Sequence, residues 1–113
     1  MASEIIPERE IEKIFVSEIN RVGGVAYKFV SPGNSGVPDR IVILPHGRII
    51  FVELKTACGS LTKLQQAQCK KIFDLGAEVF VLCGLKDLCV FFDYYRMPES
   101  AKRVNMRILR GKK

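Results

Sequence analysis

The sequence is short of the residue types that build zinc sites and disulfide frameworks. Its 113 residues include one histidine, His46, and four cysteines, none of which forms a C-x-x-C pair. A structural zinc site needs four His or Cys ligands, normally at short spacings. The sequence therefore gives no indication of zinc or of disulfides, and we expect reduced thiols with structural roles, as is usual inside cells.

Long apolar runs are also missing. No run approaches the roughly 20 apolar residues that cross a bilayer, and the first ten residues, MASEIIPERE, lack the basic and then apolar pattern of a signal peptide. With 48% hydrophobic residues and interspersed charges, the chain reads as one globular domain. We therefore expect an intracellular protein that is not associated with a membrane.

The positive charge is concentrated towards the C-terminus. Of the formal net charge of +6, residues 93–113 carry +5, because seven Lys or Arg side chains stand there against two acids. A basic tail on a near-neutral body is typical of binding to a polyanion such as nucleic acid, although it can serve solubility alone. The sequence thus predicts a domain over residues 1–92 and a basic tail over residues 93–113.

Apolar periodicity predicts alternating helices and strands. A first helix is expected over residues 7–22, where Ile11, Phe15 and Ile19 recur on one side. A second helix is expected over residues 62–75. Strands are expected at residues 25–30, 39–44, 48–55, 78–83 and 88–92. This order predicts an α/β fold whose second helix crosses over between parallel strands.

The stretch GVPDRIVILPHGRIIFVELKT carries acids at the ends of two apolar strands. A three-residue loop, with Pro45 and His46 in a type I turn followed by a left-handed glycine, would place Asp39 opposite Glu53. A four-residue loop would turn the two acids to opposite faces of the sheet. The turn residues favour the first register, in which His46 is a turn residue at the far end of the hairpin from Asp39.

Asp39, Glu53 and Lys55 are therefore expected on one face, at one end of the sheet. Directly opposed carboxylates repel each other, so a positive charge should lie between them. Mg²⁺ or Mn²⁺ suits two carboxylates and a carbonyl at a strand end, and would activate water beside a phosphate. Lys55 would orient that water or stabilise developing negative charge. The alternative is a structural ion pair between Glu53 and Lys55.

These residues form a known pattern. Pro38-Asp39, followed after 13 residues by Glu53-Leu54-Lys55, resembles the PD-(D/E)XK nuclease motif. The longer string GGVAYKFVSPGNSGVPDRIVILPHGRIIFVELKT resembles the VRR-NUC (virus-type replication-repair nuclease) domain of that superfamily, in its minimal stand-alone phage or viral form. The resemblance covers about residues 8–82. It implies a restriction-endonuclease-like core, αβββαβ, with a mixed central sheet flanked by helices.

The resemblance also implies a Mg²⁺/Mn²⁺-dependent deoxyribonuclease and its site residues. The metal ligands would be Asp39, Glu53, the main-chain carbonyl of Leu54, and a first-helix glutamate that matches Glu8. Lys55 would be the catalytic lysine, and Gln65 matches a second-helix glutamine that acts with Asp39, Glu53 and Glu8. Glu12 is the alternative to Glu8, one helical turn further on. Gln65 also fits a capping box with Thr62.

Residues 31–37 form a glycine-rich loop that would follow a nucleic acid backbone. The proposed nucleic-acid contacts are Lys28, Ser31, Gly36 and Arg40. By resemblance, the substrate would be branched DNA such as a flap or four-way junction, the protein a homodimer, and the setting the cytoplasm of a bacterium or phage-infected host. The alternatives are a non-catalytic nucleic-acid-binding module and a sequence-specific restriction-type endonuclease, whose base-reading element could come only from the tail.

Overall fold

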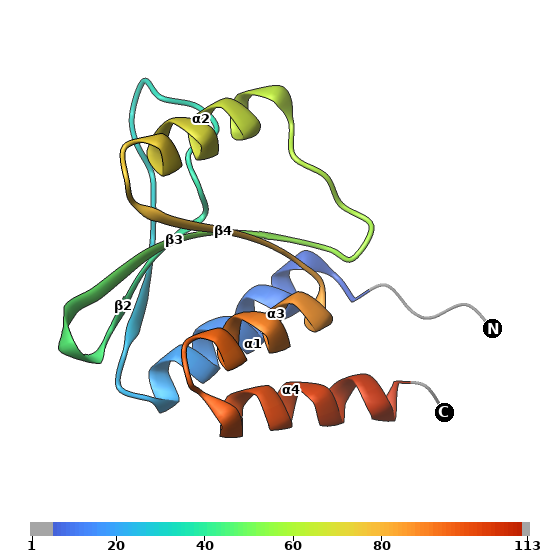
Figure 1. Ribbon diagram of the computed structural model, residues 1–113. Coiled ribbons are helices and arrows are strands. Elements are labelled where there is room, and N and C mark those ends of the chain that lie inside the picture. The colour runs from blue at the N-terminus through green and yellow to red at the C-terminus, as the bar shows by residue number, and fades with distance from the viewer. Residues whose placement is uncertain (1–5, 112–113) are drawn as a thin grey trace.

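The computed structural model describes residues 6–111 and shows a four-stranded sheet with helices on both faces (Figure 1). Its elements are α1 (Glu8–Arg21), β1 (Val25–Lys28), β2 (Arg40–Leu44), a 3₁₀ turn (Pro45–Gly47), β3 (Arg48–Lys55), α2 (Lys63–Asp74), β4 (Glu78–Cys83), α3 (Leu85–Tyr94) and α4 (Pro98–Arg110). Helix α2 lies on one face of the sheet, and α1, α3 and α4 lie on the other. The α/β fold class and the αβββαβ order are confirmed. Across residues 6–111, no helix combines the length and the apolar character needed to span a bilayer.

The register of β2 on β3 is the one that a three-residue loop predicts. The two strands are antiparallel, and Leu44 lies opposite Arg48. The pairing continues without a bulge to Arg40 at the other end of the ladder. One further step in this register brings Asp39 beside Glu53, so the two acids meet where the hairpin opens.

The turn itself differs from the prediction. His46 has a φ of 73° and Gly47 a φ of 83°, so both residues are left-handed. A type I turn over Pro45 and His46 would require a negative φ at His46, and that prediction is wrong. The strand register is still the predicted one, because it depends on the number of loop residues, and that number was predicted correctly.

Helix α2 connects two parallel strands across one face of the sheet. Strands β3 and β4 pair in parallel, which requires a crossover connection. The helix begins with a capping box, in which Thr62 and Gln65 exchange side-chain to backbone hydrogen bonds. This start fixes Gln65 in the first turn of the helix, above the end of β3.

The core lies between the sheet and helices α1 and α3. Alternate residues of β3, namely Ile50, Val52 and Leu54, are fully buried on this side. The rings of Phe15 from α1 and Phe91 from α3 meet edge to face, with centroids 5.3 Å apart. Because side chains alternate along a strand, Glu53 and Lys55 point to the opposite face, towards α2.

Residues 88–92, predicted as a fifth strand, belong to helix α3. Their apolar character fits either element, but the buried positions recur every three or four residues: Leu85, Leu88, Phe91 and Phe92. Asp87 accepts a 2.7 Å hydrogen bond from the backbone N–H of Cys83 in the first turn. The strand prediction is wrong because it overlooked this helical spacing and start.

The basic C-terminal segment forms a helix that packs on the domain. In α4, Val104 is fully buried in the core. Arg103 Nη2 lies 2.8 Å from Oε1 of Glu18 on α1. Burial alone would raise the pKa of Glu18, but the hydrogen bonds from Arg103 hold that pKa below its usual range. The predicted domain boundary after residue 92 falls inside α3, and the segment beyond it is part of the fold.

Candidate active site

Asp39 and Glu53 lie side by side on the α2 face of the sheet. The backbone N–H of Asp39 donates to Oε1 of Glu53 at 3.2 Å, and the N–H of Leu54 donates to Oδ2 of Asp39 at 2.9 Å. Phe29 secures the main chain here, because its N–H donates to the carbonyl of Asp39 at 2.8 Å. Two carboxylates from neighbouring strands are thus held by backbone contacts at one end of the sheet.

Glu53 is the most unusual ionisable group of this pair. Glu53 is almost fully buried, with only 1% of its surface exposed. The pKa of Glu53 is raised to about 7, chiefly by burial. The negative charge of Asp39 and, more weakly, that of Glu8 also raise this pKa, whereas Lys55 and the N–H of Asp39 lower it. A carboxylate with this pKa lacks enough positive charge around it, which is the condition that a bound cation would relieve.

Lys55 shares the face of Glu53, two residues further along β3. Its Nζ lies 3.7 Å from Oε2 of Glu53, and its side chain is 16% exposed. The backbone of Lys55 is held at the end of β4, since its carbonyl accepts a 2.9 Å hydrogen bond from the N–H of Gly84, which directly follows that strand. The ammonium group therefore lies beside the carboxylates with part of its surface open to solvent.

Gln65 combines the two roles that the sequence left open. Its Oε1 accepts the N–H of Thr62 at 2.9 Å in the capping box, while its Nε2 donates to Oε2 of Glu53 at 3.1 Å. The amide thus uses its oxygen for the helix start and its nitrogen for the site. Gln65 holds one oxygen of Glu53 in place and anchors it to α2.

The glycine-rich loop contributes by packing against α2. Gly36 has a φ of 90°, and a Cβ atom at this position would lie 2.7 Å from the carbonyl carbon of Leu64 and 3.0 Å from the nitrogen of Gln65. The positive φ and the clash of a Cβ atom with α2 each require glycine here. Gly36 therefore lets the loop approach the first turn of α2, which positions Gln65.

The donor set fits a hard divalent cation. The N–H of Leu54 points to Asp39, and in an extended strand the carbonyl of the same residue points to the same side. Two carboxylates and one carbonyl suit Mg²⁺ or Mn²⁺, which usually keep several waters. Within residues 6–111, no three His, Cys, Asp or Glu side chains gather around one ion. Glu8 is exposed at the start of α1, and its charge adds to the rise in the pKa of Glu53.

Comparisons with known proteins agree with this geometry. No protein-family model matches the sequence. The chain is 53% identical over 78 residues to "Putative nuclease p44" of Acyrthosiphon pisum secondary endosymbiont phage 1, an alignment that covers 69% of this chain and 84% of that protein. A solved structure described as a VRR_NUC domain superposes with a TM-score of 0.74 at 31% identity, covering 78% of this chain and 96% of that one. The chain belongs to the VRR-NUC domain family.

The predicted nucleic-acid contacts of this VRR-NUC domain do not form one surface. Arg40 points away from Asp39, to the α1 face, where its Nη1 donates to the carbonyl of Ala26 at 2.8 Å and its Nη2 lies 3.3 Å from Glu12. Lys28 is exposed on the same side. Ser31 accepts a 2.9 Å hydrogen bond from Asn34 within the loop. The residues that were predicted to contact one nucleic acid backbone therefore lie on two sides of the sheet.

One buried residue near the two carboxylates was not predicted from the sequence. Cys69 is buried one turn after Gln65 on α2. Burial raises the pKa of its thiol, and the charges of Glu53 and Asp39 raise it further, which places the thiol near both acids. The four-residue spacing from Gln65 was the available signal, since such residues share a helix face. Cys69 is therefore a buried neighbour of the two acids on α2.

Proposed function

We propose that this VRR-NUC domain is a nuclease that hydrolyses DNA phosphodiester bonds with Mg²⁺ or Mn²⁺ held by Asp39 and Glu53. The observation that carries the proposal is the convergence of two carboxylates, one of them almost fully buried and with its pKa raised to about 7. Repulsion in such a pair is costly unless a cation joins it. The similarity to a phage protein named as a nuclease supports the same reaction class.

The residues divide between holding the ion and acting on the phosphate. Asp39, Glu53 and the carbonyl of Leu54 would hold the cation, which when bound lowers the pKa of water and neutralises charge on the phosphate. Gln65 keeps Glu53 oriented through its 3.1 Å hydrogen bond. Lys55 is placed to hold the attacking water or to donate to a phosphate oxygen as negative charge develops.

The metal site can be tested without any nucleic acid. We expect calorimetric titration of Mn²⁺ into the wild-type protein to show a binding isotherm that Asp39→Ala abolishes, because that variant loses a charged ligand and leaves only one carboxylate at the site. Asp74→Ala removes an exposed carboxylate from the end of α2 and serves as the matched control. Equal heats from wild type and Asp39→Ala would favour the non-catalytic binding module instead.

The substrate assay follows from the same proposal. Labelled linear duplex, flap and four-way junction would be incubated with the protein in Mg²⁺ or Mn²⁺, with Asp39→Ala as the inactive control. We propose selectivity for the branched forms, since two sites in a symmetric homodimer could cut both strands of a junction. Equal rates on all three substrates would contradict that selectivity but would not contradict the proposed hydrolysis.

We also propose that a second copy of the chain covers the sheet face beside α2. Away from the end that carries Asp39, Glu53 and Lys55, this face carries uncharged residues from β1, β2 and β3, and Ile49 on it is 51% exposed. At the end of α2 above it, Phe73 is 63% and Leu75 is 83% exposed. Two molecules with a net charge of +6 repel each other, so they associate most readily through a surface that is free of charge.

The oligomeric state tests this surface. Light scattering on a sizing column is expected to give twice the chain mass of 12.7 kDa for wild type and the monomer mass for Ile49→Glu. A glutamate there would be desolvated in the dimer and would face apolar side chains. Val90→Glu on α3 is the control, since Val90 is similarly exposed on the other side of the sheet. A monomeric wild type, or a dimeric Ile49→Glu, would refute the proposed interface.

A further inference from the structure

Helix α1 carries a basic stripe on its exposed side. Arg9, Lys13, Ser17 and Arg21 follow each other at four-residue steps, and all four are exposed. Residues at this spacing form one continuous ridge along a helix. The fourteen residues of α1 make that ridge about 20 Å long. None of these residues belongs to the candidate active site.

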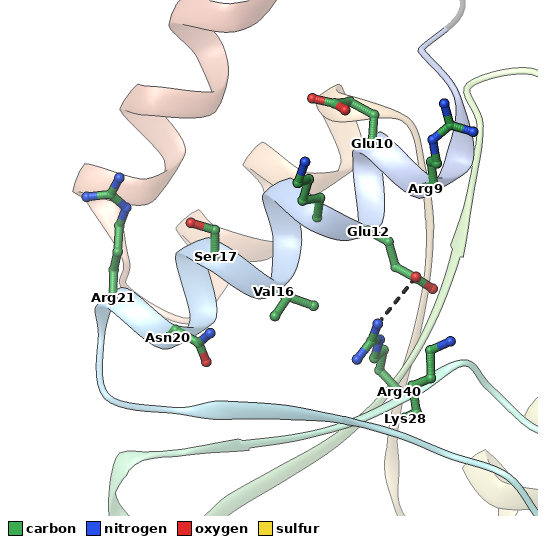
Figure 2. A pocket seen from close by; sticks show the side chains of 10 residues that line it. Arg9, Glu10, Glu12, Val16, Ser17, Asn20, Arg21, Lys28 and Arg40 are labelled. Atoms are coloured by element: carbon green, nitrogen blue, oxygen red, sulfur yellow. Dashed lines mark ion pairs between the residues drawn. The ribbon is translucent and has the colours of Figure 1, made fainter.

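The stripe borders a groove between α1 and the first two strands. The groove has a volume of about 910 Å³, and Lys28 and Arg40 line it from the strand side (Figure 2). Its lining holds five cations and two acids, Glu10 and Glu12, so it accounts for half of the net charge of the chain. Glu12 is already paired with Arg40 at 3.3 Å. The other four cations are exposed: Arg21 lies 3.7 Å from Glu18, and Arg9, Lys13 and Lys28 face solvent.

The groove reaches the same end of the sheet as the catalytic pair, but on the opposite face. Arg40 directly follows Asp39 and points to α1, whereas Asp39 itself contacts Glu53 on the α2 face. Lys28 lies opposite Arg40 in the β1–β2 ladder. A polyanion in the groove therefore does not lie over the catalytic carboxylates. It lies beyond them, around the end of the sheet.

We propose that this groove binds the phosphate backbone of the nucleic acid arm that extends away from the cleaved bond. The inference rests on the proposed nuclease function for the identity of the polyanion. A ridge of about 20 Å spans about six base-pair steps along the axis of B-DNA. Four exposed cations on two facing elements suit backbone contacts, which fix position without reading sequence.

Binding without cleavage tests the groove. Anisotropy of a labelled four-way junction is measured in EDTA over a series of salt concentrations, so that no hydrolysis occurs. The double variant Arg9→Gln/Lys13→Gln is expected to bind about tenfold more weakly at low salt, and to lower the slope of log K against log salt by about 2. These values follow from two lost phosphate contacts. The matched control is Lys70→Gln/Lys71→Gln, which removes the same charge from α2 on the other face of the sheet.

The outcomes separate the groove from the catalytic proposal. An unchanged slope in the groove variant, an equal loss in the α2 control, or no binding by wild type would each overturn the groove. A selective loss supports it, even if Asp39→Ala proves as active as wild type and the catalytic assignment falls. Conversely, cleavage that depends on Asp39 together with an unchanged slope would keep the nuclease and remove the groove.

Discussion

Replacing Lys55 with alanine is expected to lower the rate of DNA cleavage about 100- to 1,000-fold while DNA binding stays close to that of wild type. The ammonium group lies 3.7 Å from Oε2 of Glu53, beside the proposed metal ligands. Its charge acts mainly as negative charge develops on the phosphate, so its loss affects the transition state more than the bound substrate. Single-turnover cleavage and anisotropy in EDTA would measure the two effects separately.

The same substitution has an indirect effect that needs its own control. Lys55 lowers the pKa of Glu53, which is raised to about 7, so the variant has a higher pKa at Glu53 and more of the protonated form near neutrality. If this were the only defect, raising the pH from 7 to 9 would restore the activity of Lys55→Ala relative to wild type. A defect that persists at pH 9 assigns Lys55 a direct role on the substrate. Lys86→Ala on α3 controls for loss of one exposed charge.

The central pair could be derived from sequence because its geometry depends on counting. A loop of three residues fixes the register, and the period of two along a strand then fixes the face. That is why Asp39 and Glu53 meet even though the backbone of the Pro45–Gly47 turn was predicted incorrectly. The same period also determines that Arg40, adjacent to Asp39, must point to the other face.

Features that depend on contacts between distant segments were harder to derive. The partner of Gly36 is the first turn of α2, and nothing in the loop composition distinguishes packing against a helix from approach to a ligand. The pairing of Arg103 with Glu18 joins residues 85 positions apart. Net charge alone could not reveal that pairing, so the C-terminal segment was interpreted as a peripheral tail. Its apolar residues were the neglected signal, because they recur at helical spacing on one side of α4.

Val104→Asp is expected to destabilise the protein by about 4 kcal/mol or more, enough to unfold many single domains. Val104 is fully buried in the shared core, and Ala101 on the same helix and Met97 just before it are also buried. An aspartate there would be a charge buried in the apolar core, where the buried residue one turn away, Ser100, carries only a hydroxyl group. Urea denaturation followed by circular dichroism would show a much lower midpoint, or no folded baseline.

The neighbouring position supplies the matched control. Asn105 is exposed on α4, so Asn105→Asp introduces the same negative charge on the same helix without burying it. Both variants change the net charge equally, and any shared loss of DNA binding is therefore electrostatic. A midpoint for Val104→Asp equal to that of Asn105→Asp would mean that α4 does not pack on the core in solution. Residues beyond α3 would then act as the basic appendage that their charge first suggested, with Arg103 free to contact phosphate instead of Glu18.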